Sequence, residues 1–491
     1  MRKDAQLRSS PTLLQNSGAM LAASVATRIV GYAITITIAR MLGGEQFGRL
    51  AFAAVAVGYL GVMVEFGTSN WLVREVARQR VQADGVARAT ARVRLVVYAL
   101  GLPLVAVLAL TIHKTPDVKL AMGLVAASLL PKTVTGIYIA LMQGHERMDL
   151  VAGLSVAEVT ASLVLCITAL VISPSIVTLT AAGLVSAFVE LVIARTFCRR
   201  AGCPVRLTGK ATPWRAAAAG GAPFLVTAML GAAYFKADIL LLSFLCGDLQ
   251  VGYYSAASRL IESARFIPWA LSFPLYPLLS KGFAEGRPEI HELQARAAGL
   301  LLAVGLPIAA LSSVFSREII MLLYGAEFAP AAAALKWLAW AVPLMYVNIL
   351  FCFSAYAQDR QRQVMWLMSG MFVFNIGFNV WAIPAYGITG AAVSTVLTEV
   401  LALVFYSAVL LWKPNALPRF SRTAIKAGLA CAAAGGLRPV SDMIGPVPAG
   451  VLVLALYCAL LVRLGAVNLG EVKALSLMAG LLGGRGVNLH E

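Results

Sequence analysis

The sequence predicts an all-α polytopic membrane protein, and three observations support this fold class. Of the 491 residues, 60% are hydrophobic and only 13% are charged, and the mean hydropathy is +0.81. Apolar runs of about 20 residues recur along the chain, which is the length that an α-helix needs to cross the hydrocarbon core of a bilayer. Lysine and arginine lie almost entirely in alternate gaps between these runs. A soluble core requires none of these features.

About 14 segments qualify as transmembrane helices. The connections between them are too short for a soluble catalytic domain, and the last two segments are interrupted by glycine and proline. The predicted spans are 12–39, 47–70, 93–112, 118–141, 151–172, 176–197, 217–245, 250–280, 297–316, 331–357, 364–383, 388–411, 423–440 and 447–465.

The distribution of lysine and arginine predicts the orientation. If the N-terminus is cytoplasmic, the inside segments hold 28 lysines and arginines, including six across 74–94 of which Arg94 is the last. The outside segments hold six, which are Arg40, Arg49, Lys114, Lys119, Arg317 and Arg438. Cytoplasmic segments of polytopic proteins carry such an excess, so both termini are predicted to be cytoplasmic. The net charge of +17 then reflects topology and attraction to anionic lipid headgroups. Nucleic acid is not expected as a partner.

Metal, disulfide and nucleotide chemistry are not expected. The seven cysteines contain no CxxC pair and mostly lie in predicted spans. The segment GKAT at 209–212 lacks the upstream glycine and the following serine or threonine of a Walker A loop. The first span contains Arg28 and no small-residue cleavage pattern, so it is predicted to be a retained helix rather than a signal peptide.

Two parts of the chain repeat at nearly the same offset. Three residues of RMLGGEQFGRLAFA recur 204 positions later in FLCGDLQVGYYSAA, and TAAGLVSAFVE recurs 209 positions later as TGAAVSTVLTE. The first set of pairs is Gly43 and Gly247, Gly48 and Gly252, and Ala53 and Ala257. An even number of predicted spans separates the copies, so the repeats are parallel, which is a transporter architecture. Chance similarity among glycine- and alanine-rich segments is the alternative.

The repeat predicts a division of the chain into two six-helix lobes plus two C-terminal helices. The predicted parts are a cytoplasmic N-terminus (1–11), an N-lobe (12–198), a cytoplasmic linker (199–216), a C-lobe (217–412), two C-terminal spans (413–465) and a cytoplasmic tail (466–491).

Between about 12 and 412 the chain resembles the Wzx-type oligosaccharide flippases, which are related to the MATE exporters and to the lipid II flippase MurJ. The resemblance rests on NSGAMLAASVATRIVGYAITITIARMLGGEQFG with FG at 66–67 and RE at 74–75, on APFLVTAMLGAAYFKADILLLSFLCGDLQVGYYSAASRL, and on IPWALSFPLYPLLS. Gly325, Phe328 and Ala331 match a further family pattern. The resemblance implies two bundles around a central cavity that opens alternately to each side of a bacterial inner membrane.

The same resemblance implies a substrate and partners. The substrate would be an undecaprenyl-pyrophosphate-linked oligosaccharide, moved to the periplasmic leaflet for surface polysaccharide or exopolysaccharide synthesis. Membrane lipids surround such a protein, and a polysaccharide polymerase and glycosyltransferases are candidate partners. The chain is not expected to be an enzyme.

The six basic residues that belong to neither the inside nor the outside set fall inside predicted spans, where each costs about 3 kcal/mol if it faces lipid. They are Arg28, Lys132, Lys236, Arg259, Arg265 and Lys336. Helical spacing places Arg28 on one face with Gly31 and Thr35, and Arg259 and Arg265 on one face with Glu262. The three arginines are predicted to form a cationic patch, because guanidinium groups bind phosphate oxygens in pairs. An internal salt-bridge ladder around Glu262 is the alternative.

Other polar residues in the spans are secondary candidates. Tyr234, Lys236 and Lys132 are predicted to contact substrate, although Lys236 could reach the interface and Lys132 could fill a helix break next to Pro131. Asp238 and Glu65 could couple transport to H⁺ or Na⁺, or be packing residues. The membrane potential could also drive export of an anionic headgroup.

Two further groups have a mechanical or structural interpretation. Pro268 and Pro274 could act as a gating hinge or shape a fixed kink. Glu190 and Glu399, equivalent in the two copies, and the pair Asn375 and Asn379 are interpreted as interhelical contacts.

Three other functions are weighed against the flippase. A MATE-like exporter of cations would need acidic residues in its cavity, whereas the excess here is basic. A MurJ-like lipid II flippase shares the mechanism and is poorly separated by sequence. A membrane-bound polymerase or glycosyltransferase would need a large outer loop, and the predicted outer loops are short, at 40–47, 113–118, 173–175, 246–250 and 384–387.

Overall fold

The computed structural model describes residues 10–78, 83–202, 212–410, 426 and 445–463, and all regular structure in them is helical. This confirms the all-α prediction. Within these residues, eight helices are long and apolar enough to cross a membrane, or up to nine if one bent pair counts as a single span. The predicted span 423–440, apart from Lys426, and the tail 466–491 lie outside the described residues. The predicted total of about 14 therefore stays a prediction.

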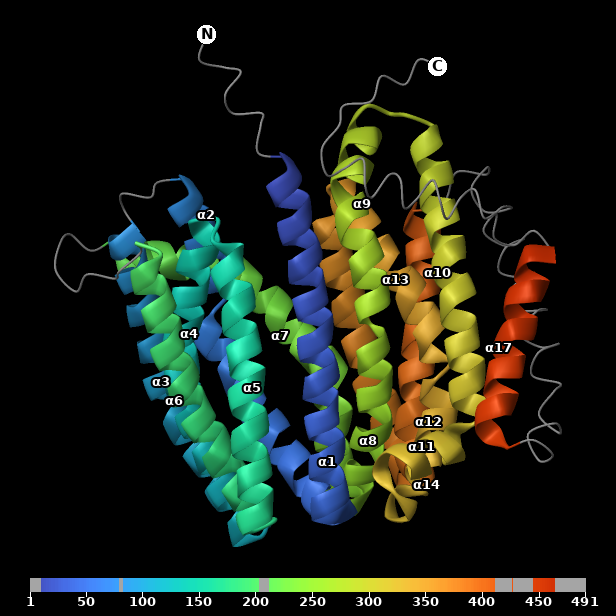
Figure 1. The fold of residues 1–491 in the computed structure, drawn as a ribbon, viewed down its shortest axis with the longest axis horizontal. Helices are drawn as coiled ribbons and strands as arrows, with labels where there is room; N and C mark the ends of the chain where they lie inside the picture. The colour runs from blue at the N-terminus through green and yellow to red at the C-terminus, as the bar shows by residue number, and fades with distance from the viewer. Residues whose placement is uncertain (1–9, 79–82, 203–211, 411–425, 427–444, 464–491) are drawn as a thin grey trace. The chain divides into compact units, whose positions relative to one another are not determined.

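The chain forms two compact units, residues 1–252 (unit 1) and residues 253–491 (unit 2). In unit 1, α4 packs against α6, α1, α2 and α3, while α5 packs against α6 and α1, and α7 packs against α1, α2 and α3 (Figure 1). The helices of unit 1 are α1 (Ser10–Glu65), α2 (Thr68–Arg78), α3 (Ala83–Thr111), α4 (Pro116–Gly144), α5 (Met148–Ile172), α6 (Ile176–Arg200), α7 (Trp214–Leu245) and the beginning of α8 (Asp248–Ala264).

Two predicted helix boundaries in unit 1 differ from the structure, and both differences involve residues with positive φ. The outer connection predicted over 40–47 is shorter than expected, because two helices meet within α1 at Gly43, whose φ of 77° a residue without a Cβ adopts readily. The predicted span 47–70 is also too long. It ends at Glu65, since Phe66 and Gly67 both take positive φ values and start a new helix at Thr68.

The predicted repeat has a physical counterpart at its glycines. Gly43 and Gly247 both have positive φ, at 77° and 85°. A Cβ on Gly48 would collide with the main-chain oxygen of Asp248, and a Cβ on Gly252 would collide with the main-chain oxygen of Gly44. Asp248 stands 204 residues after Gly44, so the second contact is the first with the two copies exchanged. Chance similarity does not explain this reciprocity.

In unit 2, α13 is the central helix and packs against α9, α10 and α14. Gly325 turns the chain with a φ of 93°, and Phe328 and Ala331 behind it are completely buried. The helices of unit 2 are the remainder of α8, α9 (Phe266–Ala284), α10 (Glu289–Val314), α11 (Ser316–Tyr324), the 3-10 turn η2 (Ala326–Phe328), α12 (Ala331–Leu338), α13 (Ala341–Ala357), α14 (Gln361–Leu410) and α17 (Pro446–Arg463).

Four predicted spans of unit 2 are arranged differently from expectation. The span predicted over 250–280 is two helices, since α8 ends at Ala264 and α9 begins at Phe266. The span predicted over 331–357 is the bent pair of α12 and α13, with an angle of 43° between them. Conversely, the spans predicted over 364–383 and 388–411 belong to α14, which is interrupted at Gly387 with a φ of 55°.

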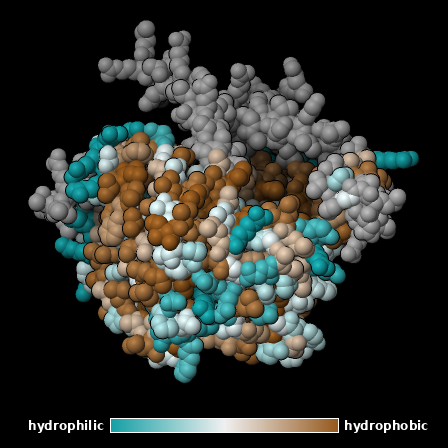
Figure 2. Space-filling view, turned by 60° about the horizontal axis from the view of Figure 1, so that its bottom comes forward, coloured by the Kyte–Doolittle hydropathy of each residue, from teal (hydrophilic) through white to brown (hydrophobic). Residues whose placement is uncertain are grey.

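Apolar side chains cover much of the exposed helical surface (Figure 2). Leu100, Leu110, Val171 and Ile172 are each more than 70% exposed. Such an exterior would be unfavourable in water, and it is the surface that a bilayer solvates. The protein is a multi-pass membrane protein.

We expect Gly48→Ala and Gly252→Ala to destabilise unit 1 by about 1–3 kcal/mol each, because the added methyl group meets main chain that cannot move aside. Thermal unfolding of the detergent-purified protein measures this. Gly123→Ala and Gly183→Ala are matched controls, since no heavy atom lies within 4 Å of either new methyl group. Equal unfolding temperatures for Gly48→Ala and Gly123→Ala would contradict the close approach.

Candidate functional site

The six basic residues of the predicted spans all lie outside the tightly packed core. Arg28 on α1, Lys132 on α4, Arg259 on α8 and Lys336 on α12 have exposed side chains. Lys236 on α7 and Arg265 at the end of α8 are half-buried. Their positive charges are therefore placed on surfaces that a ligand, headgroups or water can reach.

The two arginines near the end of α8 lie close to Glu262. Arg259 Nη1 lies 3.9 Å from Glu262 Oε2, as the spacing of three residues predicts. Arg265 is the single residue between α8 and α9, has helical φ and ψ angles, and donates its main-chain N–H to the Glu262 carbonyl at 3.2 Å. The geometry of this junction therefore sets where Arg265 lies.

The candidates on α7 divide by burial as their helical phase predicts. Asp238 is buried, accepts the main-chain N–H of Ile239 at 2.9 Å and interacts electrostatically with Tyr59 of α1. Lys236 is half-buried on another face of the helix. Tyr234 is half-buried too, and its ring packs edge-on against Phe235 with centroids 4.5 Å apart.

Glu65 at the end of α1 belongs to a polar network that the sequence analysis missed. Its electrostatic partner is Arg94, whose side chain is only 1% exposed. The Arg94 guanidinium donates to Thr68 Oγ1 at 2.8 Å, to Ser69 Oγ at 2.7 Å and to the main-chain oxygen of Thr133 at 3.1 Å. The network joins the turn after α1 to α2, α3 and α4.

Arg94 was grouped with the cytoplasmic loop charges of 74–94, and this assignment is wrong. The residue lies three turns inside α3. The sequence signal for its burial was the spacing of four residues from Thr90, which places both residues on one helix face. In the structure Thr90 is completely buried. An arginine on the buried face of a membrane helix needs several internal acceptors, and the sequence does not reveal which helix supplies them.

Lys132 has acidic neighbours within unit 1. Glu190 of α6 is buried and interacts electrostatically with both Lys132 and Glu158. A hydrogen bond of 2.9 Å between Ser162 and Ser186 joins α5 to α6. The exposed Lys132 amino group thus partly compensates the Glu190 carboxylate.

The equivalent acid in unit 2 has a structural partner. Asn348 donates to Glu399 Oε2 at 2.7 Å and to the Glu399 main-chain oxygen at 2.9 Å. Across the interruption in α14, Asn375 donates to Ser394 and Thr398, each at 3.3 Å. The interpretation as interhelical contacts is confirmed for Glu399 and for Asn375, whereas Asn379 donates to Asn375 of the same helix at 2.9 Å.

A second missed cluster lies at the beginning of α8. Asp248 Oδ1 accepts from Lys114 Nζ at 2.6 Å and from Ser243 Oγ at 2.8 Å, and both charged side chains are less than 15% exposed. Arg49 Nε lies 4.0 Å from the other carboxylate oxygen. Lys114 and Arg49 were both assigned to outer segments. Lys114 does lie in the connection between α3 and α4, whereas Arg49 lies within α1. The cluster holds this connection, α7 and α8 together.

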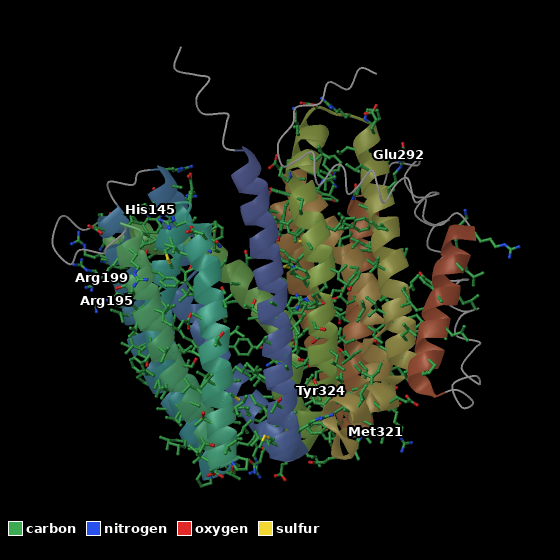
Figure 3. The ribbon with its side chains drawn as sticks, viewed as in Figure 1. His145, Arg195, Arg199, Glu292, Met321 and Tyr324 are labelled. Atoms are coloured by element: carbon green, nitrogen blue, oxygen red, sulfur yellow. The ribbon has the colours of Figure 1, made fainter. Side chains whose placement is uncertain are left out.

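The ends of the helices carry the expected charges. Figure 3 shows His145, Arg195 and Arg199 at the same end of unit 1, which is the end predicted to be cytoplasmic. In unit 2, Glu292 lies toward one end and Met321 and Tyr324 lie toward the other (Figure 3). Glu292 forms an ion pair with Arg296 one turn later.

The predicted gating prolines lie just beyond the α8–α9 junction. Pro268 is buried in the first turn of α9, and α9 continues past Pro274 and Pro277. No group of three or more potential metal ligands occurs among the residues that the structure describes.

Comparison with known proteins identifies relatives for this arrangement. A sequence model for the family described as polysaccharide biosynthesis protein matches residues 13–283, and the MatE model matches residues 223–381. A protein of Haloferax volcanii, named as the probable low-salt glycan biosynthesis flippase Agl15, is 24% identical over 184 residues. That alignment spans 37% of this chain and 39% of the relative's length.

Solved structures share the fold at low identity. The lipid II flippase MurJ, in an inward closed conformation, has a TM-score of 0.73 at 13% identity, covering 91% of this chain and 99% of that one. An inward-facing multidrug resistance MATE transporter of the MOP superfamily has a TM-score of 0.65 at 16% identity, covering 80% and 94%. A MOP superfamily transporter from Pyrococcus furiosus has a TM-score of 0.61 at 15% identity, covering 86% and 98%.

We expect Arg94→Met to destabilise the protein by about 2–4 kcal/mol, because it removes three hydrogen bonds from a charged donor inside unit 1. Arg92→Met is the matched control on the same helix, and since Arg92 is exposed it should change stability by less than about 0.5 kcal/mol. Thermal unfolding in detergent compares them. A similar small effect for both variants would show that the Arg94 network contributes little.

We expect Lys114→Met and Asp248→Asn to be strongly non-additive, with a coupling energy of about 1–3 kcal/mol in a double-mutant cycle. The reason is that this ion pair is largely removed from water. The exposed pair of Arg147 and Asp149 serves as the control, with an expected coupling of about 0.2–1 kcal/mol. Additive effects at Lys114 and Asp248 would exclude a direct energetic link.

Proposed function

The chain belongs to the polysaccharide biosynthesis protein family, within the MOP superfamily of flippases and transporters, and on this basis we propose that it flips undecaprenyl-pyrophosphate-linked oligosaccharide. The lipid-linked sugar moves from the cytoplasmic to the periplasmic leaflet of a bacterial inner membrane by alternating access. It is then used for surface polysaccharide or exopolysaccharide synthesis. The named relatives are flippases and transporters rather than enzymes.

The observation that carries the proposal is the placement of three arginines in apolar helices, outside the packed core. Arg28 and Arg259 are exposed, and Arg265 is half-buried at a helix junction. A pyrophosphate headgroup carries about two negative charges, which guanidinium groups bind through paired hydrogen bonds without losing their proton. We assign Arg28, Arg259 and Arg265 to the headgroup, with Lys132, Lys236 and Tyr234 as additional contacts.

The driving force can come from the charge of the substrate. Moving negative charge out of a cell with a negative interior gains about 2.3 kcal/mol per charge per 100 mV. Coupling to H⁺ or Na⁺ through Asp238 or Glu65 is the alternative. Asp238 is the stronger candidate for this role than Glu65. Glu65 faces the permanent cation Arg94. Asp238 interacts with the neutral Tyr59.

Lipid II is the second candidate substrate, and the fold similarity to MurJ favours it. It carries the same polyprenyl pyrophosphate, so the proposed arginine contacts serve both substrates. The neighbouring genes would distinguish the two substrates. Genes for glycosyltransferases and a polymerase would favour the surface polysaccharide, and cell-wall genes would favour lipid II. The proposed orientation has both termini in the cytoplasm, in agreement with the distribution of positive charge.

We expect Arg28→Ala to lower surface-glycan export at least tenfold at normal membrane abundance, because one cationic group for the pyrophosphate is lost. Arg28→Lys should retain part of the activity, since the charge stays and the paired geometry is lost. Complementation of an export-deficient strain measures both. The control is Arg317→Ala, which removes an exposed positive charge from α11. Normal export by Arg28→Ala would remove Arg28 from the site.

We expect the double variant Arg259→Gln with Arg265→Gln to accumulate lipid-linked oligosaccharide on the inner leaflet. Glutamine retains hydrogen-bonding capacity and removes both charges, so binding of an anion is selectively weakened. Accessibility of the glycan to a lectin in inside-out and right-side-out vesicles provides the measurement. If the glycan distributes as in wild type, the arginines have a structural role.

A further inference from the structure

The junction between α8 and α9 leaves a half-buried main-chain carbonyl, that of Ala264, without its helical partner. α8 ends at Ala264, and Pro268 lies four residues later. In a continuous helix the carbonyl of Ala264 would accept the N–H of residue 268, but proline has no N–H. An unpaired carbonyl inside a membrane protein is costly because no water replaces the missing donor.

Tyr346 supplies the missing donor from another helix. Its hydroxyl donates to the Ala264 oxygen at 2.8 Å, and the tyrosine is completely buried in α13, which packs against α9 (Figure 1). The carbonyl belongs to the peptide unit that joins Ala264 to Arg265. The bond from Tyr346 therefore fixes the peptide plane from which the Arg265 backbone departs.

The same arrangement occurs a second time in unit 2. Pro307 lies inside α10, so its missing N–H releases the carbonyl of Ala303. The hydroxyl of Tyr457 on α17 donates to that oxygen at 2.9 Å, and Tyr457 is also buried. In both cases a buried tyrosine from a neighbouring helix donates to the carbonyl four residues before a proline. The recurrence indicates that tyrosine hydroxyls serve here as replacements for proline's absent N–H.

We propose that Tyr346 is a positioning residue for Arg265: its hydroxyl takes the place of the N–H that Pro268 lacks and holds the α8–α9 junction in the geometry that presents Arg265 to an anionic headgroup. The link to a headgroup rests on the proposed function, whereas the link between Tyr346 and the junction does not. Arg265 has ordinary helical dihedral angles, with φ −64° and ψ −16°. The backbone of the junction is therefore unstrained. The hydrogen bond from Tyr346 of α13 supplies the partner that Pro268 does not.

The test is a double-mutant cycle of Tyr346→Phe and Pro268→Ala in the full chain. Tyr346→Phe keeps the ring and removes the donor, so amide hydrogen exchange in a peptide covering 262–270 should accelerate about five- to tenfold. Affinity for undecaprenyl pyrophosphate in detergent micelles should fall by a similar factor. In the Pro268→Ala background the new N–H can pair with Ala264, so Tyr346→Phe should then change neither quantity.

Tyr457→Phe is the matched control, because it removes the same type of bond from the same unit at a different proline. It should accelerate exchange around Ala303 without changing exchange over 262–270 or the affinity for undecaprenyl pyrophosphate. Its own effect should disappear in a Pro307→Ala background.

The outcomes separate this proposal from the proposed function. If Tyr346→Phe has the same effect with proline or alanine at 268, the hydroxyl does not replace the missing N–H and the proposal is overturned. If exchange over 262–270 follows the cycle but affinity does not, Tyr346 holds the junction without positioning Arg265. If the wild-type protein does not bind undecaprenyl pyrophosphate, the proposed function fails, and the exchange data still decide the role of Tyr346.

Discussion

In the hydrocarbon core of a bilayer there is no water to pair with main-chain N–H and C=O groups, and this constraint shapes every interruption of the helices described above. Unit 1 interrupts α1 at a glycine and ends it in a turn whose Thr68 hydroxyl donates to the Glu65 carbonyl at 2.6 Å. In unit 2, Pro268 and Pro307 leave the carbonyls of Ala264 and Ala303 without a helical donor, and buried tyrosines donate to both. These three carbonyls are thus each satisfied by a side chain, which ties the end or the proline of a helix to a neighbouring element.

The charged residues obey a related constraint. A buried arginine such as Arg94 is accommodated by two hydroxyl groups and a carbonyl, and its role is to hold three helices and a turn together. Arg28 and Arg259 are instead exposed on apolar helices. The difference separates an arginine that stabilises the fold from the arginines that we propose bind an anionic headgroup. The pair of Lys114 and Asp248 resembles Arg94 rather than the exposed arginines, because it is internal and joins helix ends.

The internal repeat places equivalent residues in environments that have diverged. Gly48 and Gly252 still make reciprocal contacts, because close approach of two main chains tolerates no side chain. Glu190 and Glu399 are both buried, but Glu399 accepts hydrogen bonds from Asn348 whereas Glu190 interacts with Glu158 and Lys132. The repeated backbone geometry therefore carries different polar contacts in its two copies.

Apolar runs, the sidedness of lysine and arginine, and the glycines at an offset of 204 determined by themselves that this is a helical membrane protein with an internal repeat. These features act locally or along the chain, so they are readable without coordinates. Sequence also identified Asn375 of α14 as an interhelical contact, because an amide in a membrane helix needs a partner. The prolines at 268 and 274 indicated a hinge or a kink in this region, but not that the helix breaks at Arg265.

Tertiary structure alone decided which partner each polar group has. Arg94 looked like a loop charge, Lys114 and Arg49 looked like outer-loop charges, and Tyr346 was one of many apolar-segment residues. Each is defined by an atom that is distant in the sequence: Thr133 for Arg94, Asp248 for Lys114, and Ala264 for Tyr346. Hydrogen bonds act over about 3 Å in space and carry no signature in sequence spacing when they join different helices. The roles of these residues therefore follow from packing rather than from pattern.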